Sequence, residues 1–210
     1  MKSHSHYTRL YRKRYVYTGT DRLHRFRILK QNYTITSVIY PGSFIHITPS
    51  LVFPITTYID TDDETRDFFY DPAVFRYIEQ NRAYTDMPKV TFYHADYRTI
   101  ISDELQRYDL LISQHAGPVS SHCIDYLIKD GILLVERDND DEVNALQNER
   151  LILTGCFRKV KGNTHMPEKL LNYYLLRRSR DTLFREYLDT EHYSDFQNDE
   201  CTALVFRKVK

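Results

Sequence analysis

"SVIYPGSFIHITPSLVFPITTYIDTD", residues 37–62, joins two apolar runs through a break at Pro41-Gly42-Ser43. Both runs are short and rich in β-branched and aromatic residues, which is typical of buried strands. The second run ends on acidic residues, and helical spacing begins directly after them. A strand, a turn, a second strand and then a helix is the pattern of a sheet built from parallel strands.

The rest of the chain repeats this alternation of strands and helices. Continuous apolar runs such as "YDLLIS" and "GILLVE" indicate strands that are covered on both faces. The last run has no helix after it, so it is expected to pair antiparallel with the run before it. We therefore predict an α/β domain with a seven-stranded, mostly parallel sheet, helices on both faces and an antiparallel last strand. The predicted strands are residues 35–40, 56–60, 90–96, 108–113, 131–136, 150–160 and 202–209, and the predicted helices are residues 62–81, divided at Pro72, 117–130, 141–148 and 168–190.

The composition indicates one globular domain with an appendage, because the 210 residues are 41% hydrophobic and 28% charged. Residues 1–30 carry nine basic residues against one acidic residue, although the whole chain has a formal net charge of zero. We assign residues 1–30 to a basic, aromatic N-terminal arm and residues 31–210 to the α/β domain. The arm either contacts the phosphates and bases of RNA or forms a helix that packs on the acidic domain, because Tyr7, Tyr11 and Tyr15 recur at helical spacing.

The sequence also argues against membrane and metal-binding classes. No apolar stretch reaches the roughly 20 residues that cross a bilayer, and the charged N-terminus lacks the apolar segment of a secretion signal. The expected location is the cytoplasm, with no membrane association. The cysteines Cys123, Cys156 and Cys201 lack zinc-binding spacing, and His4 and His6 form the only close histidine pair. We expect no metal centre.

The residues that follow the predicted strands are the candidates for ligand binding, because open α/β sheets bind ligands outside the carboxyl ends of their strands. Gly42 follows the first strand and either lets a ligand approach the backbone or makes an ordinary turn. Asp60 ends the second strand and either accepts the hydroxyl hydrogens of a ribose or caps a helix, although Asp62 suits the cap better. Asp96 follows the third strand and either accepts from an exocyclic amine or pairs with Arg98.

The order of Pro41-Gly42-Ser43, Asp60 and Asp96 resembles that of the class I S-adenosylmethionine (SAM)-dependent methyltransferases, over about residues 35–210. The resemblance implies a Rossmann-like fold, SAM as cofactor, and a terminal strand inserted antiparallel beside the sixth. It implies a turn at the methionine end, Asp60 on the ribose and Asp96 near the adenine. This turn holds one glycine, where the family usually has two or three. The cofactor-binding residues that we infer are Pro41, Gly42, Ser43, Asp60, Thr61, Asp96, Tyr97 and Ser113.

The chemistry of the ligand also favours SAM over a nicotinamide dinucleotide. A dinucleotide needs the close backbone approach of GxGxxG around its pyrophosphate, and this chain has only six glycines. SAM carries no phosphate, so a turn with one glycine beside acidic residues suits it better.

The fourth predicted strand leads into "SQHAGPVSS", which in the resembling enzymes faces the methyl group and its acceptor. His115 in this segment is either the base that takes the acceptor's proton or a histidine bonded to the loop backbone. Our leading hypothesis is a SAM-dependent methyltransferase with a small-molecule or RNA acceptor. The alternative is a catalytically silent binding or scaffold module, with RNA bound through the arm. The arm and residues 162–189, rich in tyrosine and arginine, are predicted to cover the acceptor or to form a homodimer interface.

Overall fold

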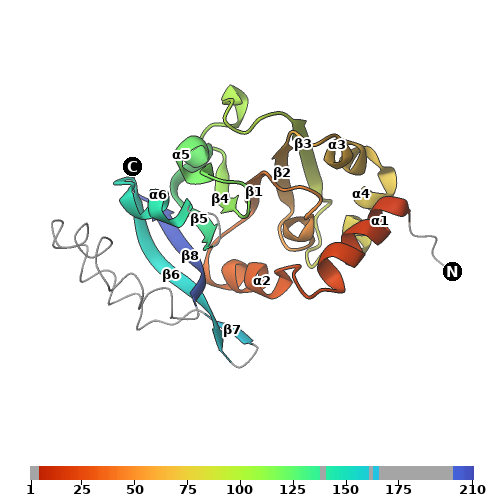
Figure 1. Ribbon diagram of the computed structural model, residues 1–210, viewed down its shortest axis with the longest axis horizontal. Helices are drawn as coiled ribbons and strands as arrows, with labels where there is room; N and C mark the ends of the chain where they lie inside the picture. The colour runs from red at the N-terminus through yellow and green to blue at the C-terminus, as the bar shows by residue number, and fades with distance from the viewer. Residues whose placement is uncertain (1–4, 138–140, 161–162, 166–200) are drawn as a thin grey trace.

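The computed structural model describes residues 5–137, 141–160, 163–165 and 201–210 (Figure 1). One sheet runs through the molecule in the strand order β3-β2-β1-β4-β5-β8-β6-β7. The first five strands are parallel to one another, and β8 lies antiparallel between β5 and β6. The strands are β1 (Ser37–Pro41), β2 (Ile55–Asp60), β3 (Lys89–His94), β4 (Tyr108–Ser113), β5 (Leu127–Glu136), β6 (Leu151–Val160), β7 (Asn163–His165) and β8 (Cys201–Lys208). The predicted α/β sheet with its antiparallel last strand is confirmed, and the three-residue β7 adds an eighth strand beside β6.

Helices cover both faces of this sheet, as predicted. Alternate residues of β1 point to opposite faces, so that Val38 and Tyr40 enter one core cluster and Ile39 enters the other. The first cluster is completed by the N-terminal helices and by α3 and α4, and the second by α5 and α6. The helices are α1 (His6–Tyr11), α2 (Leu23–Asn32), α3 (Asp63–Tyr70), α4 (Pro72–Asn81), α5 (Val119–Cys123) and α6 (Asp141–Gln147), with a π-helical segment η1 (Arg12–Val16) and the 3₁₀ segments η2 (Thr48–Leu51), η3 (Ser102–Glu104) and η4 (Ile124–Tyr126).

The starts of α3 and α4 follow directly from the sequence. The side chain of Asp62 caps α3 by accepting from Thr65 N, and Pro72 occupies the first turn of α4. The predicted helix over residues 117–130 is wrong in its second half, because β5 already begins at Leu127. Leu127 pairs there with Tyr108 of β4, so sheet pairing overrides the weak helical pattern. The predicted helix over residues 168–190 lies outside the described residues.

The N-terminal arm is folded onto the sheet. Its side chains Tyr11, Phe26 and Leu29 are completely buried in the first core cluster. The hydroxyl of Tyr11 lies 2.8 Å from Oγ1 of Thr48, a buried hydrogen bond that ties α1 to η2. The rings of Tyr11 and Phe26 therefore belong to the core and are not available to stack on bases. Within the docked arm, η1 and the start of α2 lie against the carboxyl ends of the central strands (Figure 1).

Candidate functional site

A pocket of about 600 Å³ lies at the carboxyl ends of β1, β4 and β5, on the side covered by the arm. Its volume is within the range of small-molecule sites, and its position is where open α/β sheets bind ligands. Three separate parts of the chain form its walls: the arm, the turn after β1, and the ends of β4 and β5. The lining residues are Arg14, Tyr15, Thr20, Arg22, Tyr40, Gly42, Ser43, Phe44, His46, Gln114, His115 and Glu136.

The turn after β1 requires glycine at position 42 for two reasons. Gly42 has a φ of +61°, a left-handed conformation that side chains disfavour. A Cβ atom at this position would also come within 2.2 Å of the Cβ atom of Ala116, in the loop after β4. The N–H of Gly42 donates to the carbonyl oxygen of Ile59 at 2.7 Å. The turn is therefore fixed between the ends of β2 and β4.

Backbone strain is concentrated at this pocket. Five non-glycine residues have a positive φ in the described part of the chain, and three of them line the pocket: Arg22, Phe44 and His115. Such a conformation costs about 1–3 kcal/mol for a residue with a side chain, and it persists where surrounding contacts impose it. Clustering of strained residues around one hollow is a feature of ligand sites, so it supports a functional role for this pocket.

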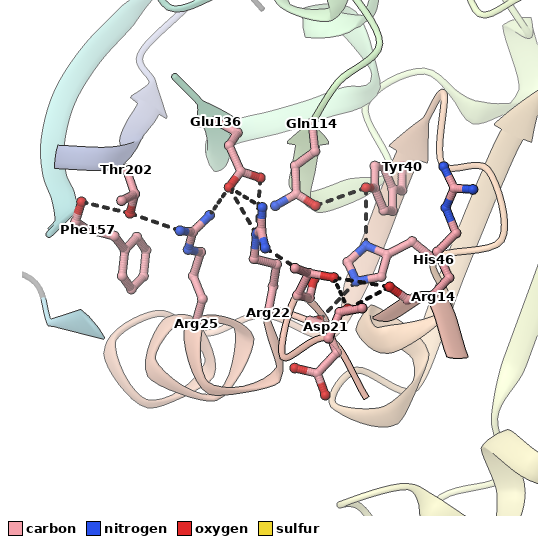
Figure 2. A network of polar contacts seen from close by, with 12 residues as sticks. Arg14, Asp21, Arg22, Arg25, Tyr40, His46, Gln114, Glu136, Phe157 and Thr202 are labelled. Carbon is pink, nitrogen blue, oxygen red and sulfur yellow. Dashed lines mark hydrogen bonds and ion pairs between the residues drawn. The ribbon is translucent and has the colours of Figure 1, made fainter. Parts of the chain in front are cut away.

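A chain of buried polar side chains forms one wall of the pocket (Figure 2). The hydroxyl of Tyr40 lies 2.9 Å from Oε1 of Gln114 and 3.2 Å from Nδ1 of His46. Nε2 of His46 lies 2.9 Å from the carbonyl oxygen of Asp21 in the arm. Burial raises the pKa of Tyr40 well above its usual value and lowers the pKa of His46 to about 4. Both groups are therefore neutral at pH 7.

A buried ion cluster forms the next part of the wall. Glu136, at the end of β5, accepts from Nε of Arg22 at 2.9 Å and from Nη1 of Arg25 at 3.0 Å (Figure 2). Burial alone would raise the pKa of Glu136, but Arg25 and Arg22 together outweigh it and hold this pKa below its usual value. Arg25 also donates to Oγ1 of Thr202 on β8, at 2.9 Å. The cluster thus connects the arm to β5 and to β8.

Arg14 stands at the mouth of the pocket. Its guanidinium carbon lies 4.6 Å from the centre of the Phe44 ring, within the range of a cation–π contact. No carboxylate in the described residues forms an ion pair with it, whereas Arg22 shares the carboxylate of Glu136 with Arg25. The pocket therefore presents an uncompensated positive charge at its mouth.

Of the residues that the sequence pointed to, the pocket brings together Gly42, Ser43 and His115. Pro41 is the last residue of β1. Ser113 is fully buried, and its hydroxyl donates to Oδ2 of Asp141 at 2.6 Å, away from the lining residues.

The predicted acidic residues lie outside the pocket lining. Oδ2 of Asp60 accepts from the N–H of Phe44 at 2.7 Å, and its Oδ1 accepts from the N–H of Asp62 at 3.0 Å. Asp60 thereby holds Phe44 in its positive-φ conformation. Oδ1 of Asp96 accepts from the N–H of Arg98 at 2.9 Å, and the Asp96 side chain is 48% exposed. The Asp96 carboxylate thus bonds within its own turn, whereas the Asp60 carboxylate connects its turn to the turn after β1.

The remaining two predicted residues also make contacts within the protein. The carbonyl oxygen of Thr61 lies 2.9 Å from Nε2 of His94. The hydroxyl of Tyr97 donates to the carbonyl oxygen of Ala116 at 2.5 Å, which connects the loop after β3 to the loop that covers Gly42.

Sequence reasoning missed most of the pocket. Glu136 ends a predicted strand, so the strand-end argument could have found it. Tyr40 and His46 flank the predicted turn, but their place in the pocket wall depends on burial and on their mutual hydrogen bond, which the sequence does not show. Arg14 and Arg22 lie in the arm, and no local pattern places them at the sheet. Among the residues that the structure describes, no group of three or more potential ligands could hold a metal ion, and no helix is long and apolar enough to span a membrane.

Comparison with known proteins supports the fold alone. The sequence matches no protein-family model and no curated protein sequence. The N-methyltransferase NodS from Bradyrhizobium japonicum WM9 has a similar structure, with a TM-score of 0.51 and 10% identity over 90% of this chain and 96% of that chain. An rRNA methylase from Streptococcus thermophilus aligns with a TM-score of 0.48 and 8% identity, over 89% of this chain and 95% of that chain. The described fold is that of the class I SAM-dependent methyltransferases.

Proposed function

We propose that this protein is a SAM-dependent methyltransferase in which the turn after β1 and Asp60 hold the donor and the pocket holds the methyl acceptor. The observation that carries the proposal is the placement of a strained, polar pocket at the carboxyl ends of β1, β4 and β5 on a methyltransferase fold. NodS, which shares this fold, is an N-methyltransferase.

The turn after β1 and the two acidic residues outside the pocket lining fit the donor. An ionised carboxylate offers about four acceptor positions, and Asp60 uses two of them for backbone N–H groups. Two remain for the ribose hydroxyls. Asp96 would accept from the adenine amine, and Gly42 and Ser43 would contact the methionine part of the donor. When bound, SAM would supply a methyl group on a positively charged sulfur, and the lone pair of an oxygen or nitrogen acceptor could displace the neutral thioether from that methyl group.

The chain's own residues position the acceptor and receive its proton. The arm covers the carboxyl ends of the strands and limits the access of water. His115 lies on the same wall as Gln114, at the end of β4, and is the candidate to accept the proton from an oxygen or nitrogen nucleophile. Methyl transfer mainly requires alignment of the reacting atoms, which the rigid turn and the strained loop of His115 can provide.

A second candidate function is a silent binding module on the same fold. It is favoured by the contact of Ala116 with Gly42 and by the internal hydrogen bonds of Asp60 and Asp96. In this alternative the acidic residues only stabilise the turns to which they bond, and the pocket binds a ligand without transferring a methyl group to it.

Isothermal titration with SAM and with S-adenosylhomocysteine separates the two functions. The proposal predicts that both ligands bind and that Asp60→Asn weakens them about tenfold or more, because it removes a charge-assisted acceptor. Asp63→Asn is the matched control, since Asp63 is an exposed acid on α3 with 76% of its side chain accessible. Absence of heat with either ligand would exclude the methyltransferase and leave the binding module.

A further inference from the structure

The strand β3 (Lys89–His94) forms one end of the sheet and pairs only with β2 among the described residues (Figure 1). Its sequence, KVTFYH, is rich in β-branched and aromatic residues, and its pairing with β2 is continuous along its whole length. An edge strand of this kind can accept another strand along its open side, because its outer backbone groups have no partner in the sheet.

The backbone groups of alternate residues in β3 face this open edge. The N–H of Lys89 donates to the carbonyl oxygen of Pro54 at 2.8 Å, and the N–H of Ala95 donates to that of Asp60 at 3.0 Å. Successive residues of a strand direct these groups to opposite edges, so the odd-numbered residues bond to β2. The residues whose N–H and C=O groups point away from the sheet are Val90, Phe92 and His94.

Exposed apolar side chains gather around this edge. The connection from β3 to β4 contains the short η3 and no α-helix, and Thr91 on the face that it crosses is exposed. On the opposite face the ring of Phe92 stacks on Phe69 with centroids 4.7 Å apart, and the ring of Tyr70 lies edge-on to it at 6.4 Å. The large apolar side chains that are exposed beside β3, or in the segments that enter and leave it, are Tyr70, Met87, Ile100 and Leu105. A concentration of exposed apolar surface marks an interaction site.

A second copy of the same strand, placed antiparallel, can satisfy all the open backbone groups at one register. With a twofold axis at Phe92, this residue faces Phe92 of the second copy, and Val90 faces His94 of the second copy. Each facing pair then exchanges two hydrogen bonds. Both copies use the same patch, so the contact closes into a dimer and does not continue into a filament.

The side chains favour the same register. The two Phe92 rings meet across the strands, and cross-strand aromatic pairs are stabilising. Lys89 faces Ala95 of the second copy, one residue from Asp96, whose side chain is 48% exposed. A lysine on an edge strand usually discourages pairing, but this one meets an acid at each end of the paired strands. The edge is therefore complementary to itself in charge as well as in backbone.

We propose that two copies of this chain pair antiparallel through β3, around a twofold axis at Phe92, and form one continuous sheet. A specific interface buries about 800 Å² per partner, so the exposed side chains beside β3 contribute together with the strand. We expect a dissociation constant on the order of micromolar. No residue of the pocket lining belongs to β3 or to its connection with β4, so the dimer does not depend on the proposed function.

Sedimentation velocity from about 1 to 200 µM tests the dimer, and the parent protein should change from monomer to dimer over this range. Val90→Pro removes an outward N–H and keeps the bonds to β2, so it should prevent dimerisation without changing the far-UV circular dichroism. Val90→Thr, which keeps the N–H and the branched shape, is the matched control and should dimerise like the parent. A parent that stays monomeric throughout would overturn the proposal, as would a Val90→Pro dimer of unchanged affinity.

A second pair of variants keeps the test decisive if the proline unfolds the strand. Thr91→Glu adds a charge at an exposed position that would face Tyr93 of the second copy, a residue whose hydroxyl donates to the carboxylate of Glu104. The like charges should weaken the dimer about tenfold or more. Thr34→Glu, the same change at an exposed residue outside β3 and its connections, should leave the dimer unchanged. Equal effects of the two substitutions would contradict this interface.

Amide hydrogen exchange, measured by NMR, distinguishes pairing through β3 from dimerisation elsewhere. In the dimeric parent the amides of Phe92 and His94 should exchange slowly, although they point away from β2. In Thr91→Glu at the same concentration they should exchange at least about tenfold faster, whereas the amide of Tyr93, bonded to β2, should stay slow in both proteins. Rapid exchange of Phe92 in a dimeric parent would place the interface elsewhere and overturn the proposal.

These outcomes are separate from those of the SAM titration. A dimer through β3 in a protein that binds no SAM would support this inference and exclude the methyltransferase. A monomer that binds SAM would do the reverse.

Discussion

Acidification should reveal how strongly the pocket wall depends on a neutral His46. Desolvation by burial lowers the pKa of His46 from 6.5 to about 4, and only 3% of the residue is exposed. In the unfolded chain the ring binds its proton near pH 6.5, whereas in the folded protein it does so only near pH 4. The unfolded state therefore binds more protons between these two values, and stability falls as the pH is lowered through this window.

The size of the effect follows from the shift. A pKa difference of one unit corresponds to about 1.36 kcal/mol, so His46 alone should remove on the order of 3 kcal/mol from the free energy of unfolding between pH 7 and pH 4. The contribution is fully present above pH 6.5. Other groups titrate in the same range, so a variant without the imidazole is needed to isolate this one.

His46→Gln provides that reference, because its amide N–H can still donate to the carbonyl oxygen of Asp21. Urea unfolding, followed by far-UV circular dichroism because the chain has no tryptophan, would be measured for both proteins from pH 7.5 to pH 4.5. The stability of the parent protein relative to the variant should decrease by most of the 3 kcal/mol over this range. Two curves that remain parallel would show that His46 is not held neutral, and the wall would need another arrangement of hydrogens.

Three further substitutions test the turn and the ion cluster. Gly42→Ala should destabilise the fold more than Gly19→Ala, by at least about 1 kcal/mol in the free energy of unfolding measured in urea. Both residues have a positive φ, but only at Gly42 would a Cβ meet a neighbouring side chain. Equal losses of stability would mean that Ala116 moves aside freely. Glu136→Gln should cost about 3 kcal/mol, since it leaves two arginines without their carboxylate, and a loss below 1 kcal/mol in thermal unfolding would contradict the cluster. Asp60→Asn should cost about 1–3 kcal/mol in the absence of any ligand, as it weakens the bonds that hold Phe44, and an unchanged melting temperature would argue against that role.

The positions of the central strands along the chain were predictable because each of them is a continuous apolar run. "YDLLIS" and "GILLVE" are buried on both faces in the structure, as their composition indicates. Asp62 and Pro72 likewise fix helix ends through local chemistry. The start of β5 was missed because Leu127 joins the sheet through its partner in β4, and that information is not local. The short β7 was missed for the same reason.

The site was predictable only where it depends on strand ends. Gly42, Ser43 and His115 follow strands and line the pocket. Asp60 ends a strand, but its carboxylate accepts from the backbone N–H of Phe44, a contact that depends on the shape of the turn after β1. Arg14 reaches the pocket through the packing of a π-helical segment, which composition does not reveal.

The insertion of β8 between β5 and β6 has a consequence for biosynthesis. Until residues 201–208 leave the ribosome, β5 and β6 have no common neighbour, and each presents unpaired backbone groups along one edge. The nascent chain must therefore carry an unfinished sheet from the synthesis of β5 until that of β8, a state prone to aggregation. The bond from Arg25 to Thr202 joins residues far apart in the sequence, so the docked arm can reach its final arrangement only after residue 202 has been synthesised.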